Sequence, residues 1–121
     1  MYDLNPLTRL LKDNGFTTNI ETSGAHPFSG DFDWVCFSPK KFKAPHPSIY
    51  EAADELKVVV FHQSDFGFAE KHAALVRENC RKLLQPEWSK ADLFTNPIIY
   101  YVKSHPNWKV SLQTHKFMAI P

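Results

Sequence analysis

The chain has 121 residues, of which 43% are hydrophobic and 22% charged, a balance typical of one soluble globular domain. Fourteen basic and thirteen acidic residues give a formal net charge of +1, so no overall field attracts nucleic acid or an anionic membrane. No apolar run approaches the ~20 residues of a membrane span, and charged residues interrupt the amino-terminal leucines, unlike in a secretory signal. We expect a cytoplasmic protein whose residues 1–121 form a single domain unit.

The predicted elements begin with a helix. Leu4, Leu7, Leu10 and Leu11 fall on one helical face and an Asn-Gly pair follows, so a helix is predicted over residues 5–14. Strands are predicted in "FTTNIETS", ending near residue 21, and in "DWVCFSP", where a proline ends the strand. A loop and a short helix follow in "KKFKAPHPSIYEAADE".

The second half of the chain alternates strands and helices. "LKVVVFH" and "RKLLQP" are predicted strands, and the spacing between them indicates a helix from Ser64-Asp65 to about Asn79. In "SKADLFTNPIIYYVKSHPNW" we expect a helix that carries Pro97 in its first turn and Ile98 and Ile99 on its apolar face. "KVSLQT" is the last predicted strand.

This alternation predicts an α/β fold of about five parallel strands with flanking helices. In such folds ligands bind at the carboxyl ends of the strands. Each predicted strand ends there in residues able to contact a ligand: "ETSG" (21–24), "SPK" (38–40), "HQSD" (62–65), "QPEW" (85–88) and "QTHK" (113–116). We therefore expect one shared site at this edge.

Each block also has a purely structural interpretation. Glu21, expected to be partly desolvated, suits an amino-bearing heterocycle or caps a neighbouring loop. Ser38 and Lys40 offer a hydroxyl and a cation to a carboxylate or ribose, or form a plain turn. Gln85 and Glu87 suit an amino group and ribose hydroxyls, or cap a helix.

The sequence does not favour a zinc site, a redox cysteine motif, or a dinucleotide, P-loop or esterase site. His115 suits a base, a metal ligand or a neutral hydrogen-bonding group, but it belongs to no spaced metal pair, so a zinc site is not expected. Cys36 and Cys80 form no metal or redox motif and are expected to be buried free thiols. Glycine-rich dinucleotide, P-loop and esterase motifs do not occur.

Taken together, "LLKDNGF-TTNIETSGAHP", "WVCFSPK", "ELKVVVFHQSDFGFAEKHA", "LLQPEW" and "NWKVSLQTHKFMAIP" closely resemble the 7-carboxy-7-deazaguanine synthase family of queuosine and 7-deazapurine biosynthesis, which supplies a tRNA modification pathway. The resemblance covers essentially the whole chain. It implies a radical S-adenosylmethionine lyase that converts 6-carboxy-5,6,7,8-tetrahydropterin to 7-carboxy-7-deazaguanine, and the later half of an incomplete (β/α) barrel.

The resemblance also implies roles for individual residues. S-adenosylmethionine would be bound by Ser38, Pro39, Lys40, Gln85, Pro86, Glu87 and Trp88. The pterin would be bound by Glu21, His115 and the terminal carboxylate of Pro121. The family also uses a [4Fe-4S] cluster and Mg²⁺.

The chain departs from the family in lacking its amino-terminal motif of three cysteines. Cys36 and Cys80 cannot replace three clustered thiolates, so no metal ligand is expected in this chain and the polypeptide alone is expected to be inactive. Truncation and a natural half-protein are equally compatible with the sequence.

An incomplete barrel would leave its first strand at an uncovered edge, so self-association or a homodimer is expected. The alternative is a non-catalytic interaction module that associates through this edge. Another radical S-adenosylmethionine enzyme fits less well because of "SLQTHK", and direct nucleic-acid or membrane binding is not expected.

Overall fold

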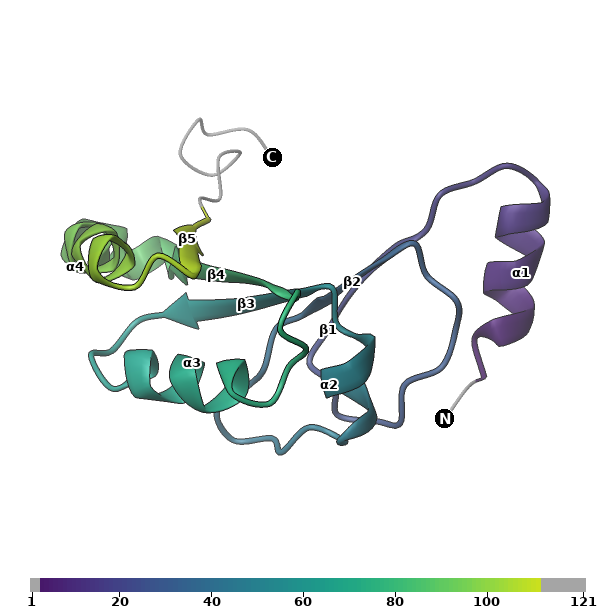
Figure 1. The fold of residues 1–121 in the computed structure, drawn as a ribbon, viewed down its shortest axis with the longest axis horizontal. Coiled ribbons are helices and arrows are strands. Elements are labelled where there is room, and N and C mark those ends of the chain that lie inside the picture. The colour runs from purple at the N-terminus through teal and green to yellow at the C-terminus, as the bar shows by residue number, and fades with distance from the viewer. Residues whose placement is uncertain (1–2, 112–121) are drawn as a thin grey trace.

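The computed structural model describes residues 3–111, which build a five-stranded parallel sheet in the order β1-β2-β3-β4-β5 (Figure 1). The elements are α1 (Asn5–Asp13), β1 (Asn19–Thr22), β2 (Trp34–Phe37), α2 (Ser48–Ala52), β3 (Glu55–Val60), α3 (Asp65–Ala73), β4 (Arg81–Pro86), the 3₁₀ helix η1 (Trp88–Lys90), α4 (Ala91–Ser104) and β5 (Trp108–Val110). This confirms the predicted α/β class with five parallel strands and flanking helices. None of these helices has the length and apolar character needed to cross a membrane.

The two faces of the sheet carry different side chains. Phe37 pairs with Leu56 and Val58 with Leu84, and all four belong to the buried core that α3 and α4 complete. The helices α2 and α3 lie together on this side of the sheet, beneath it in Figure 1. The opposite face, here called the polar face, carries Glu21, Cys36, Glu55, Lys57, Val59, Leu83 and Gln85. Because successive side chains of a strand point to opposite faces, the sheet has a core face and a polar face, and burial alternates most regularly along β3.

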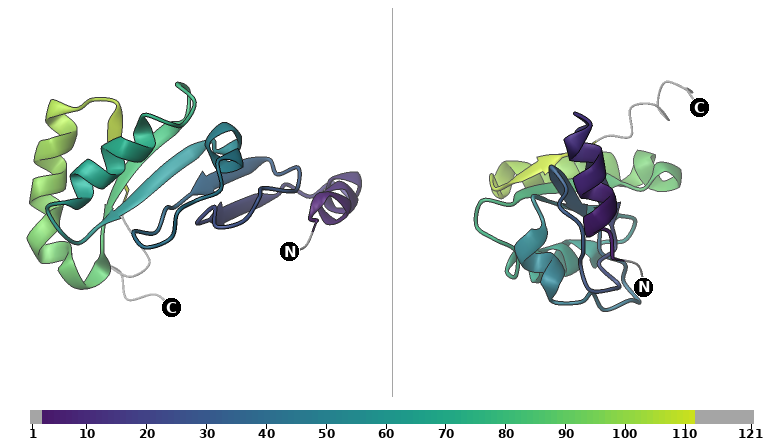
Figure 2. Two further views of the ribbon diagram at one scale, coloured as in Figure 1. Left: turned by 90° about the horizontal axis from the view of Figure 1, so that it is seen from below. Right: turned by 90° about the vertical axis from the view of Figure 1, so that its right-hand side faces the viewer.

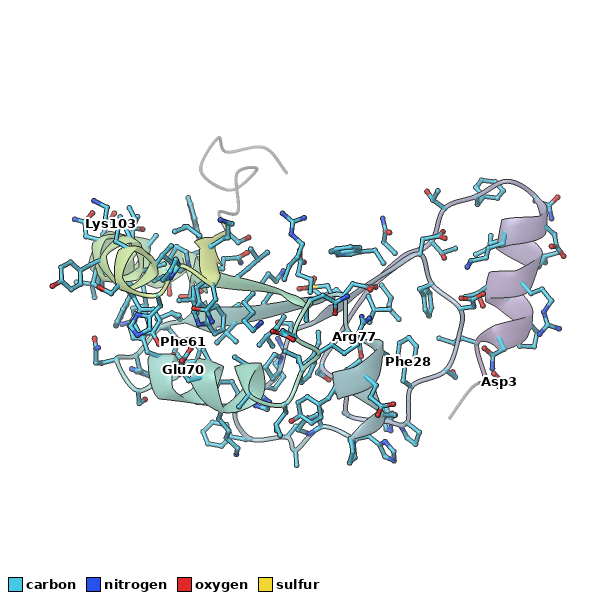
Figure 3. The ribbon with its side chains drawn as sticks, viewed as in Figure 1. Asp3, Phe28, Phe61, Glu70, Arg77 and Lys103 are labelled. Atoms are coloured by element: carbon cyan, nitrogen blue, oxygen red, sulfur yellow. The ribbon has the colours of Figure 1, made fainter. Side chains whose placement is uncertain are left out.

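Trp108 anchors the last strand to the core. Its side chain is fully buried, and its indole N–H donates a hydrogen bond to Oε1 of Glu70 on α3. Glu70 lies on the side of α3 that is turned toward the strands (Figure 3). Because β5 has only three residues, this contact adds to the backbone pairing with β4 in holding the strand in place.

Helix α1 lies apart from the other helices, at the opposite end of the long axis from α4 (Figures 1 and 2). Its buried residue is Thr8, whose Oγ1 accepts the Asp31 N–H at 2.9 Å. Lys12 pairs with Asp31 at 3.1 Å. Leu7 and Leu10 are instead 51% and 59% exposed, while Leu4 and Leu11 are half-buried. The predicted leucine face is therefore only partly covered, and polar contacts help to hold this helix.

Two predicted boundaries in the second half are wrong, and so is one predicted burial. Helix α3 ends at Ala73 rather than near Asn79, because the chain turns there to start β4 and Arg77 donates to the Ala53 carbonyl at 2.7 Å (Figure 3). Helix α4 starts at Ala91, which places Pro97 inside the helix rather than in its first turn. Ile98 is fully buried as predicted, whereas the Ile99 side chain is 39% exposed.

The exposed leucine face of α1 gives a direct test of the fold. We expect Leu10→Ser to change the free energy of unfolding by less than about 0.5 kcal/mol, since little apolar surface is lost. Leu84→Ala, in the core, should lower it by about 2–5 kcal/mol. Urea unfolding followed by circular dichroism measures both, and a large loss in Leu10→Ser would show that the leucine face is buried.

Candidate functional site

The carboxyl ends of the strands lie along one edge of the sheet because all the strands are parallel. Glu21, Thr22 and Ser23 from the end of β1 line a cavity of about 280 Å³ together with Ser38 and Lys40, which follow β2. The first two predicted blocks are therefore brought together. The resulting pocket wall offers a carboxylate, hydroxyl groups and an ammonium group.

A larger cavity of about 520 Å³ lies next to it. Ser23, Ser38 and Lys40 line both cavities, and Pro39 joins them in the larger one. Val59 and Phe61, from β3 and its end, add an apolar wall. The Ser-Pro-Lys block thus lies where polar and apolar surfaces meet, as binding of a ligand with both kinds of group requires.

Gly24 allows the sharp turn after β1. Its φ of +72° is a left-handed conformation, and a Cβ there would lie 3.0 Å from Cγ2 of Ile49. The Gly24 carbonyl accepts the His46 N–H at 2.6 Å. A glycine is needed both for the backbone angle and for this close approach.

The carboxylate of Asp65 joins three segments at this edge. Its Oδ2 accepts the N–H groups of Phe61 and His62 at 2.9 Å each, and Lys41 Nζ lies 2.6 Å from Oδ1. Burial by itself would raise the pKa of Asp65, but the Lys41 contact and the two N–H groups outweigh it and hold the pKa below its usual value. Asp65 is therefore a structural anion, and its side chain is only 2% exposed.

Glu21 does not have the partly desolvated environment expected for it. Its side chain is 55% exposed, and its Oε1 forms an ion pair with Nζ of Lys57 on β3. The register places Glu21 beside Cys36 on the polar face, which no described helix covers. Sequence reasoning missed Lys57, whose only signal is a lysine within the apolar run "LKVVV".

The Gln-Pro-Glu-Trp block is only partly placed at the cavities. Gln85 is 3% exposed; its Oε1 accepts from Ser111 Oγ at 3.2 Å, and its buried Nε2 has no hydrogen-bond partner among the described residues. It lies opposite Val59, a residue of the larger cavity.

The other residues of this block have different environments. Glu87 caps η1 by accepting the Ser89 N–H at 3.0 Å, which is the capping role left open for it. Pro86 is fully buried and Trp88 is 42% exposed.

Two predicted substrate contacts, His115 and Pro121, lie outside the described residues 3–111. The other predicted contacts separate into two sets. Glu21, Ser38, Pro39 and Lys40 share the cavities, whereas the 85–88 block flanks them along the same edge.

The two cysteines do not fit a [4Fe-4S] cluster. Cys36 and Cys80 are free and buried, as expected; Cys36 lies in β2, and Cys80 lies in the turn directly before β4. Burial, followed by the hydrogen bond that the thiol donates to the Glu55 carboxylate, raises the pKa of the Cys36 thiol to about 12, and burial raises the pKa of Cys80. No group of three His, Cys, Asp or Glu side chains in residues 3–111 is arranged to hold a metal ion. A cluster requires three thiolates in one small volume, which these residues do not supply.

No family model matches the chain. Among curated proteins, the 7-carboxy-7-deazaguanine synthase of Flavobacterium psychrophilum is 49% identical over 120 residues, which are 99% of this chain and 57% of that protein. The synthase of Synechocystis sp. is 41% identical over the same shares. The crystal structure of QueE from Escherichia coli matches with a TM-score of 0.82 at 33% identity, covering 93% of this chain and 51% of that chain.

These matches confirm the resemblance that the sequence blocks predicted. The chain is homologous to 7-carboxy-7-deazaguanine synthases over nearly its whole length, and it spans about half the length of the relatives that it matches.

The Asp65 network gives a prediction for stability. Asp65→Asn should lower the free energy of unfolding by about 1.5–3 kcal/mol at pH 7, because it weakens hydrogen bonds to a buried charged group. Asp31→Asn, at an exposed ion pair with Lys12, is the matched control and should have little effect.

The effect of Asp65 should also depend on pH. Its folded-state pKa is lowered, so its contribution is complete above the unfolded value of about 3.9 and is lost as the pH falls through the folded-state pKa. Urea unfolding between about pH 3 and pH 7 should therefore show wild type and Asp65→Asn converging in acid. A constant difference across this range would contradict the assigned role.

Proposed function

We propose that this chain forms the part of a 7-carboxy-7-deazaguanine synthase that binds S-adenosylmethionine and the pterin substrate. The proposed reaction is the radical-mediated ring contraction of 6-carboxy-5,6,7,8-tetrahydropterin to 7-carboxy-7-deazaguanine with loss of ammonia, a carbon–nitrogen lyase step toward queuosine. The main support is that relatives bearing this name match 99% of the chain. The shared cavity of Glu21, Ser38 and Lys40 gives this proposal a physical location.

The cavity residues suit the proposed ligands. The Lys40 ammonium group and the Ser38 hydroxyl would hold the carboxylate or the ribose of S-adenosylmethionine, with the 85–88 block at its other side. Glu21 carries a second carboxylate oxygen beside the one that pairs with Lys57, and it would accept hydrogen bonds from the amino-bearing edge of the pterin. His115 and the terminal carboxylate of Pro121 complete the proposed substrate contacts.

The iron–sulfur chemistry has to come from elsewhere. When bound beside a reduced [4Fe-4S] cluster, S-adenosylmethionine supplies the radical that starts such reactions, but Cys36 and Cys80 do not fit the cluster. We therefore propose that the cluster ligands and the Mg²⁺ site belong to another part of the synthase, and that this chain alone is inactive. Its proposed setting is the cytoplasm, with small molecules rather than nucleic acid or a membrane as its direct ligands.

A second candidate is a non-catalytic module that self-associates, most simply as a homodimer. Strand β1 is the outermost strand of the described sheet and pairs only with β2 there. Leu7, Leu10 and Phe16 are also exposed near this end. Sedimentation, which measures the oligomeric state, and a ligand titration together separate the two candidates. A stable dimer without ligand affinity would favour the second.

Calorimetric titration of the folded chain with S-adenosylmethionine tests the first proposal. We expect weak but measurable binding that Lys40→Ala weakens about tenfold or more, because the ammonium group is lost. Lys103→Ala, on the outer side of α4, is the matched control and should bind as wild type does (Figure 3). An absence of heat with wild-type protein of native circular dichroism would contradict a binding site in this chain.

A further inference from the structure

A third cavity lies beside the turn that follows the Ser-Pro-Lys block. Its volume is about 430 Å³, and it lies between this turn and helix α3. We call it the lysine cavity because Lys40, Lys41 and Lys43 line it from the turn and Lys71 lines it from α3. Tyr50 of α2 adds a hydroxyl-bearing wall. Of the predicted S-adenosylmethionine contacts, the lysine cavity includes Lys40.

The charges around the lysine cavity are not balanced within the described chain. Lys41 is neutralised by its ion pair with Asp65. Lys40, Lys43 and Lys71 form no ion pair among residues 3–111, and no Asp or Glu of these residues lines the cavity. Three ammonium groups around one cavity repel each other, and an anion bound between them would offset that repulsion. The formal net charge of the whole chain is only +1, so this concentration of charge is local.

The wall of the lysine cavity is held in place without a ligand. The Lys41–Asp65 ion pair fastens the turn to the start of α3, and the Lys43 N–H donates to the Lys40 carbonyl at 3.3 Å. On the other side, the Tyr50 hydroxyl and Nδ1 of the buried His72 are 3.0 Å apart. An anion would therefore meet ammonium groups whose backbone positions are already set, which lowers the entropic cost of binding.

An aromatic ring stands at the rim. Phe42 lies between Lys41 and Lys43 in the turn, lines the lysine cavity and is 98% exposed. An exposed ring next to ammonium groups suits a ligand that joins a planar base to phosphates, because bases stack on aromatic side chains. A simple inorganic anion would leave this ring unused.

We propose that the lysine cavity binds a nucleoside polyphosphate, with its phosphates among Lys40, Lys43 and Lys71 and its base on Phe42. The cavity volume favours such a small molecule over a nucleic-acid strand, which would need a basic stripe beyond this hollow. The lysine cavity shares Lys40, Phe42 and Lys43 with the larger cavity, whereas Lys71 lines only the lysine cavity of these two. The Lys71 variant therefore tests this proposal separately from the proposed function.

Calorimetric titration of the full chain with ATP and with tripolyphosphate, at about 0.15 M ionic strength, tests the proposal. Wild type should bind both. Lys43→Gln and Lys71→Gln should each weaken both ligands about tenfold. Phe42→Ala should weaken ATP roughly fivefold or more and leave tripolyphosphate unchanged. Lys103→Gln, the control on the outer side of α4, should bind as wild type does (Figure 3).

Three results would overturn the proposal. One is the absence of ATP binding at about 1 mM by protein with native circular dichroism. Another is an equal loss in Lys103→Gln and Lys43→Gln, which would mean unspecific charge attraction. Unchanged ATP affinity in Phe42→Ala would exclude a nucleotide, since the base would then have no contact with the ring.

Discussion

The buried carboxylate of Asp65 sets the geometry of the functional edge of the sheet. It binds Lys41 of the turn after β2 and the N–H groups of Phe61 and His62 after β3, and it stands at the first residue of α3. These contacts fix the Ser-Pro-Lys block relative to the neighbouring strand end. Both the larger cavity and the lysine cavity are lined by this turn, which the Asp65 contacts hold against α3.

Alternation along the strands explains why ligand-capable residues remain available. The same two-residue period that sends Phe37, Leu56 and Val58 into the core sends Glu21 and Lys57 to the polar face. No described helix covers that face, so Glu21 stays exposed instead of being buried with its partner. The chain thus combines a one-sided hydrophobic core with a hydrated surface that a ligand or a further polypeptide can cover. Relatives about twice as long are consistent with such a further segment.

The sequence was sufficient for the order and type of the elements, because alternating strands and helices leave few topologies. It also located the polar ends of the first four strands, since turn residues follow each of these apolar runs, whereas the fifth predicted end, at residues 113–116, lies outside the described residues. The sequence did not predict the long-range ion pairs. Glu21 pairs with Lys57, and Lys41 pairs with Asp65, because of strand register and loop geometry that no local sequence pattern encodes.

Periodicity also says which residues share a face but not what covers that face. The leucines of α1 therefore resemble a core stripe although Thr8 is the buried residue. Pro97 suggested a helix start because an interior proline is costly, yet six residues of α4 precede it.

The central claim is that the separate strand ends form the wall of one ligand site. Amide chemical shifts of the isotope-labelled chain, followed by NMR during titration with S-adenosylmethionine, test it most directly. Shift changes gathered at residues 21–24, 38–40 and 85–88, with α4 near Lys103 unaffected, are the predicted result. Changes confined to one of these blocks, or concentrated on α1 or α4, would contradict a shared site.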